Sequence, residues 1–297
     1  MKSAVNPPID LPQWDLGSMS YGLAHEAVKS NKYLNRLKSL ASWHRRYLIL
    51  DNGADELTEG LRGQEYIDLL NEIEPQEFIL PDVLQDGEET YKRSVQFIKE
   101  LEVAGWIFDG DDRFQKVMAV AQGKTFTEWI NCYTKFLSLP EVNIIGIPYD
   151  IDFDVNMSQT REMSKTEARA LNRINLLQHL LAKGMLTKPI HLLGMNNLDE
   201  FRTLSAYSNV LNIRSNDTTA PFAAAMVGRK WVNGHSGEKD WPALHFGVAE
   251  KTFQADDRAF YAMWNLTAYF AAVNDLEALH NMHKTDWSKM IEGGFDV

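Results

Sequence analysis

Short apolar runs alternate with longer amphipathic stretches along most of the chain. The runs are continuously apolar, which is typical of strands buried on both faces of a parallel sheet. Polar residues, glycine or proline end each run, so we interpret the runs as strands. The predicted strands are residues 19–25, 47–51, 77–82, 116–122, 142–148, 189–194, 210–215 and, more weakly, 243–248.

Between these strands the apolar positions recur at helical spacing. The predicted helices are residues 26–43, 65–73, 88–105, 126–139, 165–184, 198–208 and 256–283. About eight strand–helix units predict an α/β fold, a single-domain (β/α)₈ TIM barrel over residues 1–297. A doubly wound open sheet is the alternative, because the strand at 243–248 is weak and Pro221 makes the helix after the seventh strand uncertain.

Polar residues follow the predicted strands at the point where each one ends. They are Asp51-Asn52-Gly53, Asp82 with Gln85, Gln122-Gly123, Tyr149-Asp150, Gly194-Met195-Asn196-Asn197 and Asn216-Asp217-Thr218-Thr219. The carboxyl ends of the strands of a parallel barrel meet at one mouth. Such a set is costly to desolvate unless it binds something, although each residue alone also suits a helix cap or a turn. We therefore expect a functional site at this mouth.

Composition excludes several classes of site. Cys132 is the only cysteine, so an intrachain disulfide and a multi-cysteine zinc site are impossible, and its helical context predicts a buried apolar role. His280 and His283 share a helical face without a third ligand, and His191, inside an apolar strand, is interpreted as a core residue with satisfied hydrogen bonds. No P-loop, HExxH or GxGxxG motif occurs, so we expect neither a metal nor another cofactor.

The net charge of −11 argues against a broad, nonspecific grip on nucleic acid. Two basic pairs, Arg45-Arg46 and Arg229-Lys230, leave room for a local contact. The N-terminal residues lack the apolar stretch of a signal peptide, and no apolar run reaches the length of a membrane span. These features predict a cytoplasmic protein without a membrane partner.

The order of the strand ends resembles the catalytic barrel of the tRNA-guanine transglycosylase superfamily, including its small viral members and those that place 7-deazaguanines in DNA. The resemblance covers about residues 45–225. The similar segments are ILDNGADE (49–56), LPDVLQDGEETYKRSVQF (80–97), MAVAQGKTFTEW (118–129), IIGIP (144–148), KPIHLLGMNNLDEF (188–201) and NIRSNDTTAPF (212–222). The family's zinc site needs three cysteines and a histidine, so this chain resembles a zinc-free relative.

The resemblance implies a role for each matching residue. Asp217 would be the nucleophile that forms a covalent glycosyl-enzyme intermediate, and Asp51 the general acid/base. Asp82 and Gln122 would read the hydrogen-bonding edge of a purine-like base. The residues expected to approach the base closely, or to line its site, are Gly123, Gly146, Gly194, Met195 and Asn52.

The implied function is exchange of guanine for a 7-deazaguanine-type base in nucleic acid, with DNA slightly favoured over tRNA. Base exchange or hydrolysis on a free nucleoside or nucleotide is an alternative, as is a non-catalytic barrel that binds a base or supports an active partner. A protein partner or a homo-oligomer fits the superfamily, and a viral member would lie in the host cytoplasm. The Gly-containing segment 231–241, with Trp231 and Trp241, is the predicted place of polynucleotide contact.

Overall fold

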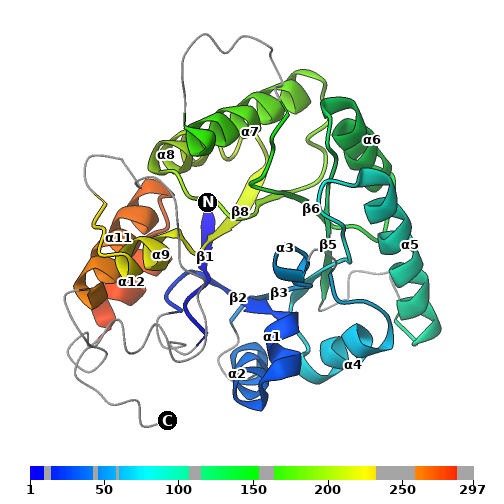
Figure 1. Ribbon diagram of the computed structural model, residues 1–297, viewed down its shortest axis with the longest axis horizontal. Coiled ribbons are helices and arrows are strands. Elements are labelled where there is room, and N and C mark those ends of the chain that lie inside the picture. The colour runs from blue at the N-terminus through cyan, green and yellow to red at the C-terminus, as the bar shows by residue number, and fades with distance from the viewer. Residues whose placement is uncertain are drawn as a thin grey trace.

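The computed structural model describes residues 1–9, 15–42, 46–57, 60–106, 115–153, 164–231 and 258–285. Eight parallel strands form a closed barrel in which each strand pairs with its neighbours in chain order (Figure 1). The strands are β1 (Lys2–Val5), β2 (Met19–Leu23), β3 (Leu48–Asp51), β4 (Glu77–Ile79), β5 (Lys116–Val120), β6 (Ile144–Ile147), β7 (Ile190–Leu192) and β8 (Ile213–Thr218). The prediction of a (β/α)₈ TIM barrel is confirmed.

The barrel closes where β1 lies between β2 and β8. Lys2 pairs with Ser215 and Val5 with Thr218, while Ala4 pairs with Met19 on the other side. The sequence analysis did not identify β1, so Asp51 and Asp217 lie on the third and eighth strands, one place later than expected. The strand predicted at 243–248 falls outside the described residues, and the barrel closes without it.

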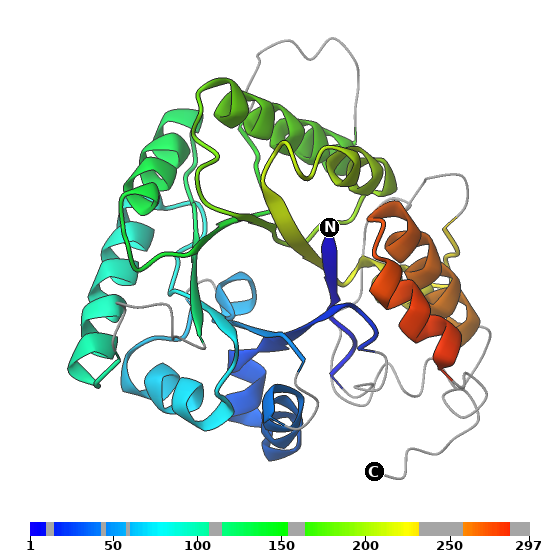
Figure 2. The same ribbon diagram turned by 180° about the vertical axis from the view of Figure 1, so that it is seen from behind.

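Helices surround the barrel, as both views show (Figures 1 and 2). They are α1 (Ala24–Lys29), α2 (Asn31–Ser42), α3 (Ala54–Leu57), α4 (Gly63–Ile73), α5 (Gly87–Val103), α6 (Phe126–Leu137), α7 (Lys165–Ala182), α8 (Leu198–Ala206), α9 (Ala220–Met226), α11 (Arg258–Ala272) and α12 (Leu276–Lys284). None of the described helices is both long and apolar enough to cross a membrane.

Local signals explain where several helices begin. Ser164 and Glu167 form a reciprocal capping box at the start of α7, and Asn197 caps α8 through its side chain. Pro221 stands in the first turn of α9, where a missing backbone N–H costs nothing. The predicted helix at 26–43 is divided into α1 and α2 because Ser30 takes an extended conformation.

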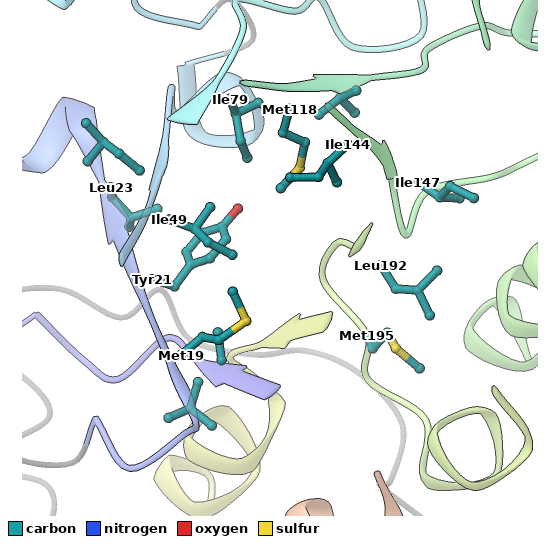
Figure 3. Packing of buried hydrophobic residues seen from close by; sticks show 14 of the residues in the cluster. Met19, Tyr21, Leu23, Ile49, Ile79, Met118, Ile144, Ile147, Leu192 and Met195 are labelled. Carbon is teal, nitrogen blue, oxygen red and sulfur yellow. The ribbon is translucent and has the colours of Figure 1, made fainter. Parts of the chain in front are cut away.

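Apolar side chains fill most of the barrel interior at mid-height, beside the buried polar pair His191 and Ser215. Tyr21, Ile49, Ile79, Met118 and Ile144 point into it (Figure 3) and are all buried. Cys132, on α6, is buried in the surrounding core, as predicted. This packed layer separates the two ends of the barrel, so polar side chains at the carboxyl ends of the strands lie in a closed-bottomed mouth.

Candidate active site

A cavity of about 620 Å³ opens at the carboxyl ends of the strands. Its walls come from β2, β3, β5, β8 and several strand–helix loops, so residues far apart in sequence share it. Among its lining residues are Tyr21, Asp51, Asp82, Gln122, Gly194, Met195 and Asp217. Tyr149 and Asp150 also line it, so all six of the predicted strand ends meet in one place.

Asp217 is held through a single carboxylate oxygen. The backbone N–H of Gly194 donates to Oδ1 at 3.1 Å, and Nε2 of His191 lies 3.2 Å from the same atom. No described residue hydrogen-bonds to Oδ2. The Asp217 side chain is 8% exposed and lines the cavity, so Oδ2 is the oxygen available to a bound molecule.

His191 is a site residue whose role the sequence did not reveal. Its ring is fully buried, with Nδ1 2.8 Å from Oγ of Ser215 and Nε2 beside Asp217. The expectation that its hydrogen bonds are satisfied is confirmed, but one partner is the predicted nucleophile. No sequence signal could have found it, because its position depends on the strand register: Gly146, His191 and Ser215 pair across three strands, and Ser215 is two residues from Asp217 on the same strand face.

A buried ion pair outside the barrel orients the Gly194 peptide. Nε of Arg173 donates to Glu200 at 2.6 Å, and Nη1 donates to the carbonyl of Leu193 at 2.7 Å. The carbonyl and N–H of a trans peptide point in opposite directions. Because Arg173 draws the Leu193 carbonyl toward α7, the N–H of Gly194 points toward Asp217.

Asp51 lies in a different environment from Asp217. Its Oδ2 accepts a hydrogen bond of 2.6 Å from the Tyr21 hydroxyl, and its Oδ1 accepts one of 2.9 Å from the backbone N–H of Gly53. Burial raises the pKa of Asp51 to about 6, the two hydrogen bonds limit the rise, and the charge of Asp217 adds to it. A carboxyl group with this pKa can gain and lose a proton near neutral pH.

Asp82 is fixed by two side-chain amides. Asn52 donates to Oδ1 at 2.9 Å, and Gln122 donates to Oδ2 at 2.8 Å. Burial raises the pKa of Asp82 to about 7, although both hydrogen bonds oppose the rise. Gln122 in turn accepts from the backbone N–H of Gln85, so the amides of Asn52 and Gln122 serve mainly to position Asp82.

The three predicted glycines have different surroundings. Gly194 lines the cavity with a left-handed φ of 62°, as the turn after β7 requires. A Cβ on Gly123 would lie 2.5 Å from the backbone nitrogen of Trp129, so this glycine permits close packing of α6. Gly146 lies among the side chains of Leu193, Val120 and Met118. Contact of Gly123 or Gly146 with a base stays a prediction.

Charge around the cavity is mostly acidic. The lysine and arginine side chains among its described lining residues, Lys29 and Arg169, are paired with Glu26 at 2.8 Å and Asp152 at 2.6 Å. Burial raises the pKa of Asp150, which also lines the cavity, above its usual range. Within the described ranges, no cluster of three His, Cys, Asp or Glu residues could hold a metal ion.

The predicted polynucleotide contacts find little support in the described residues. Trp231 is buried, and the ammonium of Lys230 lies 3.6 Å from the ring centroid of Trp264. Arg46 donates to the backbone carbonyl of Asp15 at 2.7 Å. Arg45, Trp241 and the rest of segment 231–241 lie outside the described residues.

Comparison with known proteins identifies no family for this chain. No protein-family model matches the chain, and no curated protein matches it significantly. The geometry of the cavity and the order of the strand ends therefore carry the functional argument.

Proposed function

We propose that this protein is a base-exchange glycosyltransferase that replaces guanine by a 7-deazaguanine-type base through a covalent aspartyl-glycosyl intermediate. The observation that carries the proposal is the pair Asp51 and Asp217, two carboxyl groups that line one cavity in contrasting environments. Asp217 is fixed through Oδ1 with Oδ2 uncontacted by described residues, whereas Asp51 has a pKa near neutrality. Glycosidic exchange needs these two roles: a fixed nucleophile and a group that transfers a proton.

In the first half of the reaction, Oδ2 of Asp217 attacks the anomeric carbon of the nucleoside. The glycosidic bond breaks, its electron pair leaves with the base, and protonated Asp51 donates a proton to the departing base. In the second half, Asp51 removes a proton from the incoming base, whose ring nitrogen attacks the same carbon. The bond to Asp217 breaks, and the enzyme returns to its starting state.

Asp82 is suited to recognition of the base. When ionised, its two oxygens still have lone pairs free after the bonds from Asn52 and Gln122, so they can accept from two adjacent N–H groups of a guanine-like edge. Because both amides hold the carboxylate in place, the acceptors are fixed before the base arrives. This arrangement favours bases that present neighbouring donors.

Nucleic acid, with DNA favoured over tRNA, remains the proposed substrate. The cavity volume suits a single nucleoside, so a residue of a duplex must be turned out of its stack to enter. A free nucleoside is the second candidate, and one observation favours it: the basic side chains at the described cavity wall are already paired with carboxylates, which leaves no obvious grip on a phosphate.

The test is incorporation of radiolabelled guanine and 7-deazaguanine bases into DNA, tRNA and free nucleosides by the wild-type protein and by Asp217→Asn. We expect label to enter one of these substrates with the wild-type protein and not with Asp217→Asn. Thermal unfolding of the variant should show a transition close to that of the wild type, so that loss of activity is not loss of folding. Asp199→Asn, an exposed carboxylate on α8, is the matched control and should retain activity. Incorporation that persists in Asp217→Asn contradicts the proposed nucleophile, and absence of label from every substrate contradicts the proposed reaction.

A further inference from the structure

A continuous line of hydrogen bonds runs through the barrel interior to Asp217. It begins at the opposite end of the barrel, where Arg214 donates to both oxygens of buried Glu77, at 2.6 and 2.9 Å. Nε of Arg214 donates to Oγ of Ser215 at 3.0 Å, and Ser215 contacts Nδ1 of His191 at 2.8 Å. The line ends at Oδ1 of Asp217, 3.2 Å from Nε2 of His191.

An irregularity in the sheet makes this line possible. The pairing of β7 with β8 shifts between Ile190 and His191, so that His191 pairs with Ser215 and Arg214 has no partner in the register. Arg214 instead extends across the barrel from β8 to Glu77 on β4 and to the hydroxyl of Tyr47, 3.1 Å away. The Arg214 guanidinium is thus hydrogen-bonded to Ser215 through Nε and to Glu77 and Tyr47 through Nη1.

The groups at the two ends of the line set the direction of its bonds. An ionised carboxylate only accepts, so the Nε2 of His191 that faces Asp217 carries the proton. In a neutral imidazole Nδ1 is then an acceptor, so the Ser215 hydroxyl donates to it. The Ser215 oxygen accepts from Nε of Arg214, because arginine has only donors.

We propose that His191 is a positioning residue for Asp217, held by Ser215, Arg214 and Glu77 in the neutral tautomer that carries its proton on Nε2. The inference rests on the proposed function for the role of Asp217, but the tautomer itself does not. His191 and the N–H of Gly194 both occupy Oδ1, so the carboxylate cannot rotate without losing two hydrogen bonds. Oδ2 is thereby kept toward the cavity.

Nuclear magnetic resonance of the protein with ¹⁵N-labelled histidine tests the tautomer without any substrate. At about pH 8 we expect a neutral His191 with a protonated Nε2 and an accepting Nδ1, as the hydrogen-bond partners require. The signal is assigned by its loss in His191→Gln. Ser215→Ala should move the Nδ1 resonance, because that nitrogen loses the hydrogen bond it accepts. Ser208→Ala, another buried serine whose hydroxyl bonds elsewhere, should leave it in place.

The kinetic arm compares two replacements of His191 in the exchange assay. The side-chain amide of glutamine can present an N–H where Nε2 of histidine lies, whereas leucine fills the space without a donor. We expect His191→Leu to lower kcat about 10- to 100-fold with little change in KM, and His191→Gln to recover most of the loss.

A protonated Nδ1, an imidazolium at about pH 8, or an Nδ1 resonance unmoved by Ser215→Ala overturns the proposal. Equal kcat loss in His191→Leu and His191→Gln, with both variants folded, also overturns the positioning role. Because the resonance experiment needs no substrate, it decides the tautomer even if the protein proves to catalyse another reaction.

Discussion

Replacement of Asp51 by asparagine should stabilise the protein while removing its proposed acid/base group. Asparagine is nearly isosteric with aspartate and keeps a carbonyl oxygen for the N–H of Gly53. Its amide can donate to the hydroxyl oxygen of Tyr21, which now donates to Asp51. The substitution therefore removes a charge from a buried site without removing its hydrogen bonds.

The magnitude follows from the pKa of Asp51. Folding raises it from 3.8 to about 6, so the folded state binds the proton more tightly than the unfolded chain. The stability that protonated Asp51 contributes to the wild type is fully present below about pH 4, and it is lost as the pH rises through about 6. The rise in pKa corresponds to a loss of about 3 kcal/mol in the free energy of unfolding at pH 8. This value is an upper bound, because the Asp51 side chain is partly exposed to the cavity.

Urea unfolding of the wild type and Asp51→Asn at about pH 4.5 and pH 8 measures the effect. We expect the variant to gain about 1 kcal/mol in free energy of unfolding at the lower pH and up to about 3 kcal/mol at the higher pH. Asp199→Asn, which changes an exposed carboxylate on α8 away from the cavity, should change neither value appreciably. An effect of Asp51→Asn that is equal at both pH values would refute the reasoning, because the stability difference would then not follow the titration of Asp51.

Two further substitutions test how the site is supported. Arg173→Met should lower the free energy of unfolding by about 3–5 kcal/mol, because it leaves Glu200 as an unpaired buried charge, and a second change, Glu200→Leu, should restore much of it in urea unfolding. Gly123→Ala should cost at least about 1–3 kcal/mol by the same measurement, because its methyl group would collide with the backbone of Trp129; unchanged stability would contradict a packing role for this glycine.

The barrel was predictable from sequence because most of its strands are continuous apolar runs. The exception, β1, has four residues including Lys2 and Ser3, so it lacks such a run. Ser3 is satisfied by Asp275, whose carboxylate accepts from its backbone N–H at 2.8 Å, a partner 272 residues away. Likewise β8 extends to Thr218 rather than ending at 215, because its last residues pair with the distant strand β1, and the side chain of Asn216 donates to the hydroxyl of Tyr269. Local patterns do not report such distant partners.

The candidate site, like the fold, was predictable only where a local sequence pattern reports it. Asp51, Asp82 and Asp217 were identified because polar residues at strand ends converge in any parallel barrel. His191 and Arg173 were not identified as site residues, because His191 lies within a strand and Arg173 within a helix. Their roles depend on the register of β7 with β8 and on the packing of α7 against α8. Only the folded arrangement specifies both.

The seam between β1 and β8 also has a consequence for the timing of folding during synthesis. Val5 pairs with Thr218, 213 residues later in the chain. At translation rates of about 5–20 residues per second, roughly 10–40 s separate the emergence of these two strands from the ribosome. During that interval one edge of β1 has no partner from its own chain, and the partially made sheet is open to pairing with other nascent chains. The exposed Lys2 at the start of β1 places a charge on that edge, which disfavours such association until β8 arrives.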